Sequence, residues 1–172
     1  ENDTLVFFLS DNGGPTKELT SSNLPLRGGK GQMYEGGIRV PFLFKWPSKV
    51  PAGKTYDRPV LSTDIFATIH AAAGVPKPKG EYIESYDLLP YLTGKHKEDP
   101  HEWLYWRQSH KAAFRVGDMK ILRQSPKKWE LYDLAKDPSE TKDLSKEMPE
   151  QLNLLYASWE KINGNMVEPL FK

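Results

Sequence analysis

The chain of 172 residues contains no cysteine. Disulfide bonds, zinc sites built on thiolates and a cysteine nucleophile supplied by this segment are therefore excluded. No apolar run approaches the roughly 20 residues that cross a bilayer, so the sequence predicts no membrane span. Neither sign of charge is in excess, because 24 Lys and Arg residues stand against 23 Asp and Glu residues. Without a basic field, we expect no nucleic-acid partner.

What the chain does contain is material for a packed core. Hydrophobic residues make up 38% and aromatic residues 12% of the sequence, which indicates a folded domain and not a disordered polymer. The chain starts Glu-Asn-Asp-Thr and enters an apolar run at once, with no signal peptide before it. We therefore expect that it continues from a longer polypeptide.

The apolar run over residues 5–9 predicts a strand, and its lack of alternation is typical of a strand buried on both faces in a parallel sheet. Asp11 and Asn12 follow it, at the edge where open α/β sheets bind ligands. A carboxylate and an amide oxygen suit a hard cation such as Ca²⁺ or Mg²⁺, although they supply only part of a shell of about six to eight oxygens. The alternative is a plain turn, for which Asp-Asn-Gly-Gly is a good sequence.

Glycines surround Lys30 in the sequence Arg-Gly-Gly-Lys-Gly. A lysine in this setting can meet a sulfate or phosphate oxygen as a point charge, with backbone amides nearby. The alternative is a solvated surface lysine. A P-loop is excluded, because Gly31 and then a strand follow in place of Ser or Thr and a helix. Glu35 and Arg39 flank Gly-Gly-Ile and are predicted to brace this turn by ion pairing, or to orient Lys30.

The rest of the chain predicts two parts with a boundary near residue 100. Alternation over residues 40–46 indicates a second strand, and a helix from Asp64 places Phe66 and Ile69 on its apolar face and ends at Gly74. The later elements are four short strands at 103–107, 112–116, 119–123 and 129–132, predicted to form an antiparallel sheet, and a helix from Pro149 to Gly164. We predict that residues 1–100 are the remainder of an α/β domain and residues 101–172 a small α+β subdomain.

The four histidines have no metal-binding spacing such as His-Glu-x-x-His. His110 lies in a loop between two predicted strands, and we consider it a candidate for lining a substrate pocket because loops often carry function. No Gly-x-Ser-x-Gly elbow occurs, so the sequence does not encode the serine site of an α/β-hydrolase.

In their order along the chain, these segments closely resemble the second half of type I sulfatases, the arylsulfatase-like members of the alkaline phosphatase superfamily. The resemblance rests on Phe-Phe-Leu-Ser-Asp-Asn-Gly-Gly at 7–14 and on residues 26–41, where Lys-Gly-x-x-x-Glu-Gly-Gly is the most specific block. Later segments agree, at residues 62–65, 73–76, 88–94 and 129–134 and at Asp137, Pro138 and Glu140. The similarity runs through nearly all of the chain.

The resemblance implies the C-terminal part of an alkaline-phosphatase-like α/β sandwich, with a small subdomain of antiparallel sheet plus helix. It implies sulfate-ester hydrolysis in which Asp11 and Asn12 bind Ca²⁺, or Mg²⁺, and Lys30 contacts the sulfate ester. The nucleophile of the family is a formylglycine made from Cys or Ser within Cys/Ser-x-Pro-x-Arg. This chain has no such motif, so the nucleophile is expected upstream of Glu1, in the N-terminal part of the same protein.

The implied substrate is a sulfated small molecule or glycan, and the implied compartment is periplasmic, secreted or lysosomal. Two alternatives stay open: a phosphate- or phosphonate-ester hydrolase on the same scaffold, and a non-catalytic binding or structural module that folds alone with a closed surface. The main hypothesis predicts that the isolated chain is inactive and exposes an apolar sheet edge and face.

Overall fold

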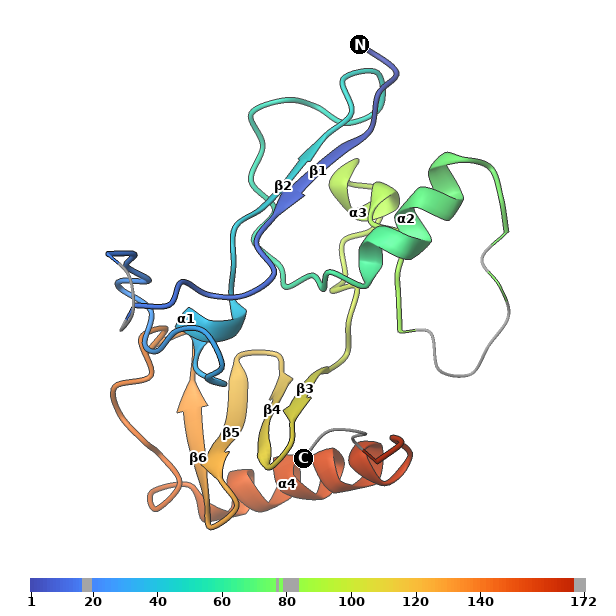
Figure 1. Ribbon diagram of the computed structural model, residues 1–172. Helices are drawn as coiled ribbons and strands as arrows, with labels where there is room; N and C mark the ends of the chain where they lie inside the picture. The colour runs from blue at the N-terminus through green and yellow to red at the C-terminus, as the bar shows by residue number, and fades with distance from the viewer. Residues whose placement is uncertain (17–19, 77, 79–83, 169–172) are drawn as a thin grey trace. The chain divides into compact units, whose positions relative to one another are not determined.

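The computed structural model describes residues 1–16, 20–76, 78 and 84–168, which form a mixed α/β arrangement. The contacts divide the chain into two compact units (Figure 1). Unit 1 contains residues 1–9 and 42–102, and unit 2 contains residues 10–41 and 103–172. No helix in the described part of the chain is long and apolar enough to cross a membrane.

Unit 1 contains a two-stranded antiparallel sheet of β1 (Val6–Leu9) and β2 (Phe42–Lys45). Both strands were predicted, but the expectation that the first is buried in a parallel sheet is wrong: its partner runs antiparallel and its exposure alternates. Phe7 turns inward and meets Phe44 edge to face, with ring centroids 5.1 Å apart. On the opposite face Phe8 is 67% exposed and Leu43 is 56% exposed. The predicted exposed apolar face is therefore confirmed.

The helices of unit 1 are α2 (Asp64–Ala72) and α3 (Leu89–Leu92). The predicted helix of residues 64–73 is confirmed, but its buried face is not the apolar one: Phe66 is 40% and Ile69 48% exposed. The buried side chains are instead Asp64, Ala67 and Thr68. Two of these are polar and accept hydrogen bonds from backbone amides of neighbouring segments, which satisfies them inside the fold.

Unit 2 is built on the predicted antiparallel sheet, with strand order β3-β4-β5-β6. The strands are β3 (Leu104–Gln108), β4 (Lys111–Val116), β5 (Met119–Ser125) and β6 (Lys128–Asp133). Each pairs with the next through a short turn, in register from Leu104 opposite Arg115 to Met119 opposite Asp133. Because successive side chains of a strand point to opposite faces, the sheet has two apolar surfaces to cover.

Different segments cover these two faces. On one face, Phe114 and Ile121 pack with Leu155 and Trp159 of α4 (Pro149–Gly164), the predicted last helix, which runs along the sheet in Figure 1. The residues on the other face are Ala113, Leu122 and Tyr132, and they pack with Met33, Tyr34 and Leu134. Met33 and Tyr34 directly precede α1 (Glu35–Ile38), a short helix that the sequence did not predict.

The glycine-rich segment that contains Lys30 is thus a layer of the C-terminal unit. Residues 10–41 make their contacts with residues 103–172, although they lie between β1 and β2 in the sequence. The predicted domain boundary near residue 100 stays a prediction for the complete protein. For the site, the consequence is that all of its candidate residues belong to one unit.

Candidate anion and cation site

Close backbone packing joins the Asp11-Asn12 segment to the segment that contains Lys30. The amide of Gly13 donates to the carbonyl of Gly37 at 2.9 Å, and the amide of Lys30 donates to the carbonyl of Gly14 at 3.3 Å. A Cβ atom added to Gly13 would lie only 1.7 Å from the carbonyl oxygen of Gly36. Only glycine allows this approach, so the pairs Gly13-Gly14 and Gly36-Gly37 let the two segments come into contact.

Backbone amides lie near Lys30, as the sequence suggested, but most of them donate to oxygens of the protein itself. Five of them donate to nearby oxygens: Gly29 N to Gln32 Oε1 (3.0 Å), Lys30 N to Gly14 O (3.3 Å), Gln32 N to Gly29 O (3.0 Å), Gly36 N to Arg27 O (2.8 Å) and Gly37 N to Tyr34 O (2.8 Å). An anion at this loop would therefore meet the side chain of Lys30 rather than a ring of backbone donors.

Lys30 is exposed, and among the described residues no ion pair of its ammonium group is found. The next residue, Gly31, has a φ of +77°, a conformation that L side chains rarely adopt, so the chain reverses directly after the lysine. This turn presents Lys30 at the surface of unit 2 with its charge available for an anionic ligand.

Asp11 is exposed, and Asn12 next to it is partly buried. The Nδ2 group of Asn12 donates to the carbonyl of Gly13 at 3.2 Å, which leaves its Oδ1 atom as an acceptor. The two side chains thus present oxygen atoms, the ligand type that Ca²⁺ and Mg²⁺ prefer. In the described part of the chain no group of three or more His, Asp or Glu residues could hold a metal alone. The donors fit a hard cation, but they supply a fraction of its shell.

His110 lies in the turn between β3 and β4 and is exposed. The next residue, Lys111, donates from Nζ to the carbonyl oxygen of Gly31 at 2.6 Å. This bond places the turn beside the residue that follows Lys30. The structure therefore brings the two predicted substrate-binding residues to the same part of unit 2, from positions 80 residues apart in the sequence.

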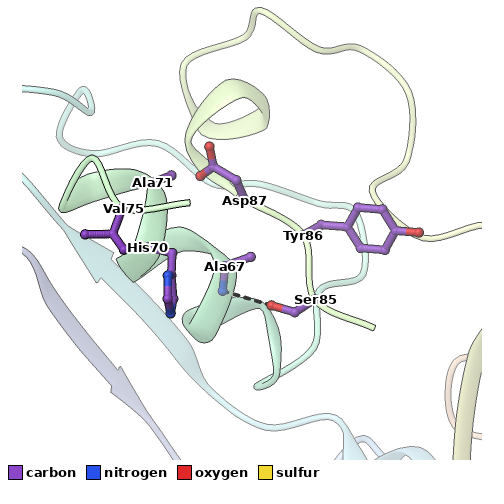
Figure 2. A pocket seen from close by; sticks show the side chains of 7 residues that line it. All are labelled: Ala67, His70, Ala71, Val75, Ser85, Tyr86 and Asp87. Carbon is purple, nitrogen blue, oxygen red and sulfur yellow. Dashed lines mark hydrogen bonds between the residues drawn. The ribbon is translucent and has the colours of Figure 1, made fainter. Parts of the chain in front are cut away.

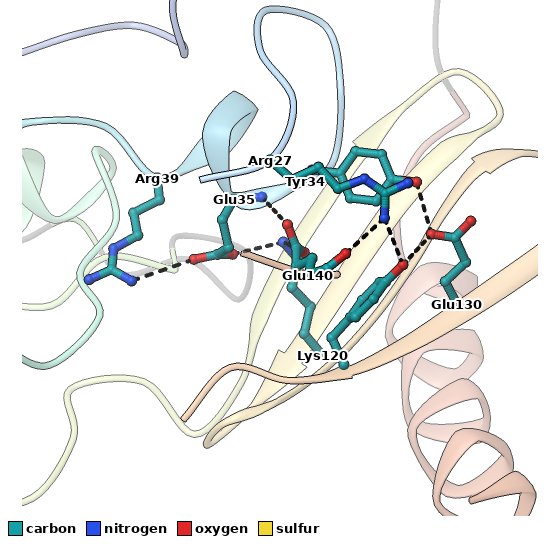
Figure 3. A network of polar contacts seen from close by, with 8 residues as sticks. Arg27, Tyr34, Glu35, Arg39, Lys120, Glu130 and Glu140 are labelled. Atoms are coloured by element: carbon teal, nitrogen blue, oxygen red, sulfur yellow. Dashed lines mark hydrogen bonds and ion pairs between the residues drawn. The ribbon is translucent and has the colours of Figure 1, made fainter. Parts of the chain in front are cut away.

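Glu35 is 3% exposed and lies at the start of α1. Its predicted partner Arg39 has its NH1 atom 4.0 Å from Glu35 Oε2 and is 61% exposed, so this pair contributes little. The strong partner is Lys120, whose Nζ donates to Glu35 Oε1 at 2.7 Å and to Glu140 Oε1 at 2.8 Å (Figure 3).

Sequence reasoning missed Lys120 and Glu140 as part of this site. One signal was available: Lys120 has the same parity as Leu122 in β5 and therefore faces inward, where a lysine requires a carboxylate partner. The identity of that partner is not encoded locally, because Glu35 lies 85 residues away.

A second polar network, shown in Figure 3, fixes Arg27. Its guanidinium lies 4.0 Å from the ring centroid of Tyr34 and donates to the Tyr132 hydroxyl at 3.1 Å and to the Glu140 carbonyl at 2.8 Å. Both phenols donate to Glu130 Oε2, at 2.9 and 2.8 Å. Burial, followed by these bonds, raises the pKa of Tyr34 to about 12 and that of Tyr132 further. Both phenols thus stay protonated and act as hydrogen-bond donors.

Unit 1 has a hollow of its own beside α2 (Figure 2). The residues that line it are Ala67, His70, Ala71, Val75, Ser85, Tyr86 and Asp87. His70 Nδ1 lies 3.2 Å from the carbonyl of Pro76, and Ser85 accepts a bond from the amide of Ala67 at 2.9 Å. These polar groups are engaged in holding the local backbone, and none of the predicted site residues lies here.

Comparison with known proteins assigns the chain to a class, the C-terminal region of sulfatases. Residues 29–164 match the family model of the C-terminal region of N-sulphoglucosamine sulphohydrolase. Because the match covers most of the chain, the chain belongs to this sulfatase family.

Individual relatives agree with this assignment. The chain is 41% identical to human steryl-sulfatase over 111 residues, which cover 60% of the chain and 19% of that protein. It is 31% identical over 176 residues to a sulfatase from Formosa agariphila, covering 88% of the chain and 30% of that protein. The crystal structure of Ps i-CgsB superposes with a TM-score of 0.80 at 34% identity, over 91% of this chain and 36% of that one. The chain thus spans about a fifth to a third of the proteins it matches.

Proposed function

We propose that this chain is the C-terminal part of a longer sulfatase that hydrolyses a sulfate ester with the help of a divalent cation. The observation that carries the proposal is that two backbone hydrogen bonds, Gly13 N to Gly37 O and Lys30 N to Gly14 O, join the segment of Asp11 and Asn12 to that of Lys30, within a chain that belongs to a sulfatase family. Oxygen donors and an ammonium group that has no partner among the described residues, both in one unit, suit a site that binds an anion beside a cation.

In this proposal the residues of the chain have separate roles. Asp11 and Asn12 supply oxygen ligands for Ca²⁺, or Mg²⁺, which when bound would screen the negative charge of the ester. The Lys30 ammonium group neutralises the oxygens of the transferring sulfuryl group, an electrostatic effect that is worth several kcal/mol when the charge is held in place. The formylglycine nucleophile would come from the N-terminal part of the protein. By itself the chain is therefore expected to show no turnover.

The proposed substrate is a sulfated small molecule or glycan. Support comes from Ps i-CgsB, whose sequence is 34% identical to this chain and whose crystal structure was determined in complex with k-i-k-neocarrahexaose. The exposed His110 next to Lys111 would contact the part of the substrate that leaves with the ester oxygen. Replacing His110 by Ala should then raise KM for the substrate by more than it lowers kcat.

The test compares the complete wild-type protein with Lys30→Ala and Asp11→Ala, using p-nitrophenyl sulfate and p-nitrophenyl phosphate. Lys30→Ala should lower kcat on the sulfate ester by about 100-fold or more, since a preorganised charge is lost. Asp11→Ala should weaken Ca²⁺ binding, measured by calorimetry. Wild-type rates in Lys30→Ala would refute the role of Lys30, and a preference for the phosphate ester would identify a phosphatase instead. Turnover by the isolated chain would contradict the need for upstream residues.

A further inference from the structure

A buried ionic cluster connects β5 to the segment that carries Lys30. Lys120 and Glu140 are fully buried, and Glu35 is 3% exposed. The Lys120 Nζ atom donates to one carboxylate oxygen of each glutamate, at 2.7 and 2.8 Å. The second oxygen of Glu140, Oε2, accepts the backbone amide of Glu35 at 2.6 Å. The cluster therefore holds both the side chain and the main chain of Glu35 (Figure 3).

Such a cluster is a costly way to gain stability. Taking three charged groups out of water carries a large desolvation penalty, which packed apolar residues of similar volume would avoid. Two carboxylates also share one ammonium group, and the exposed Arg39 approaches only one of them, with its NH1 atom 4.0 Å from Glu35 Oε2. Unlike apolar packing, the charged groups impose a defined orientation. Lys120 donates to two carboxylates, and one of these also accepts a backbone amide, so the hydrogen bonds are satisfied in one arrangement only.

Two contacts connect one face of the C-terminal sheet to the loop that contains Lys30. On the C-terminal side, the amide of Gly36, next to Glu35, donates to the carbonyl of Arg27 at 2.8 Å and so closes the loop around Lys30. In the second contact, Nζ of Lys111 in β4 donates to the carbonyl of Gly31, the residue after Lys30, at 2.6 Å. Both ties originate from the same face of the C-terminal sheet, since Lys111 and Ala113 share a parity, as do Lys120 and Leu122.

We infer that Lys120, Glu140 and Lys111 are positioning residues, through which the C-terminal sheet holds Lys30 at the place where the ester anion binds. The inference rests on the proposed function, because it assumes that Lys30 contacts the ester. It assigns to the C-terminal sheet a part in the reaction, although none of these three side chains needs to touch the substrate.

A positioning role and a merely structural role predict different effects of a substitution when Lys30 has been removed. A residue that acts through Lys30 has nothing to position once that ammonium group is gone, so its substitution should cost little in a Lys30→Ala background. A residue that only stabilises the fold lowers the active fraction equally in both backgrounds. The double-mutant cycle of Glu140→Gln with Lys30→Ala measures this difference.

The experiment uses the complete protein and measures kcat and KM on p-nitrophenyl sulfate per folded molecule. Glutamine keeps the shape of Glu140 but has a single acceptor oxygen, so either the Lys120 bond or the Glu35 amide bond is lost. We expect kcat to fall about 10- to 100-fold in the wild-type background, because a misplacement of about 1 Å costs up to about 100-fold. In the Lys30→Ala background the same change should alter kcat by less than about twofold.

The matched control is Glu147→Gln, whose carboxylate pairs with Lys142 at 2.8 Å but is 56% exposed. It should leave kcat unchanged in both backgrounds. If Glu140→Gln does not fold, Lys111→Met is taken through the same cycle, because Lys111 is only partly buried. Equal losses in both backgrounds, or no loss in either, would overturn the positioning role. A Lys30→Ala protein with unchanged kcat would instead show that the proposed function fails.

Discussion

The closest backbone contact of the site gives the sharpest prediction, the effect of Gly13→Ala. A Cβ atom on Gly13 would lie 1.7 Å from the carbonyl oxygen of Gly36, 2.7 Å from its carbonyl carbon and 2.9 Å from the Cα atom of Gly37. All three obstacles are backbone atoms, so no side-chain rotation can relieve the overlap. The two segments would have to separate.

The size of the effect follows from these distances. Real Cβ atoms essentially never approach other heavy atoms within 3.0 Å, so the carbonyl of Gly36 has to move by roughly 1 Å or more. The bond from Gly13 N to Gly37 O, now 2.9 Å, would then be lost between two buried residues. Losing a buried hydrogen bond costs about 1–3 kcal/mol and forced repacking about as much, which gives about 2–6 kcal/mol in total.

The assay is urea unfolding of the chain at 25 °C, followed by the fluorescence of its five tryptophans. The control is Gly164→Ala at the end of α4, where an added Cβ atom meets nothing within 4 Å. The control should change the free energy of unfolding by less than about 1 kcal/mol, in the stabilising direction. A Gly13→Ala chain that unfolds within about 0.5 kcal/mol of wild type would refute the close packing of the two glycine pairs.

Two further predictions concern buried or bonded carboxylates. Asp64 is fully buried, accepts hydrogen bonds from two backbone amides and lies 2.8 Å from His101 Nε2. Asp64→Ala should therefore lower the free energy of unfolding by about 3 kcal/mol. The control Asp57→Ala, at an exposed residue, should change it by less than about 0.5 kcal/mol. Burial alone would raise the pKa of Asp143, but its hydrogen bonds, above all that from Lys128, lower it to about 2. Its contribution to stability is therefore present above about pH 4 and lost as the pH falls toward 2, and acid unfolding of Asp143→Asn should lack this loss.

Patterns that depend on neighbours in the sequence predicted the C-terminal unit well. Short apolar runs between turn residues defined the four strands, and because both faces of the sheet are covered, consecutive residues of β4 and β5 are buried. The last helix begins at Pro149 and ends at Gly164 as predicted, since proline at a first turn and glycine at an end leave a strong local signal. The two motifs that contain Asp11-Asn12 and Lys30 were also visible, because each of them is contiguous in the sequence.

What the sequence could not predict depends on contacts between distant segments. The continuous apolar run of β1 was assigned to a parallel sheet, yet it pairs antiparallel with β2, and run composition alone does not encode strand direction. The apolar face of α2 was placed inward, but Asp64 and Thr68 face inward because backbone amides of other segments need their oxygens. In the same way Glu35 was paired with nearby Arg39, while its strong partner Lys120 lies on β5.

The roles of the glycines and the lysine in the specific block can now be separated. The glycines allow close contact between backbone segments, and the amides around them donate to carbonyls of both segments and to one side-chain oxygen, that of Gln32. If the proposed anion binds at this loop, the charge that it meets is that of Lys30, and a single ammonium group gives attraction without orientation. Orientation has to come from how firmly the loop is held, and the bond that holds it beside the lysine, from Lys111 to the Gly31 carbonyl, comes from the C-terminal sheet. The charge and its placement are thus supplied by segments that lie far apart in the sequence.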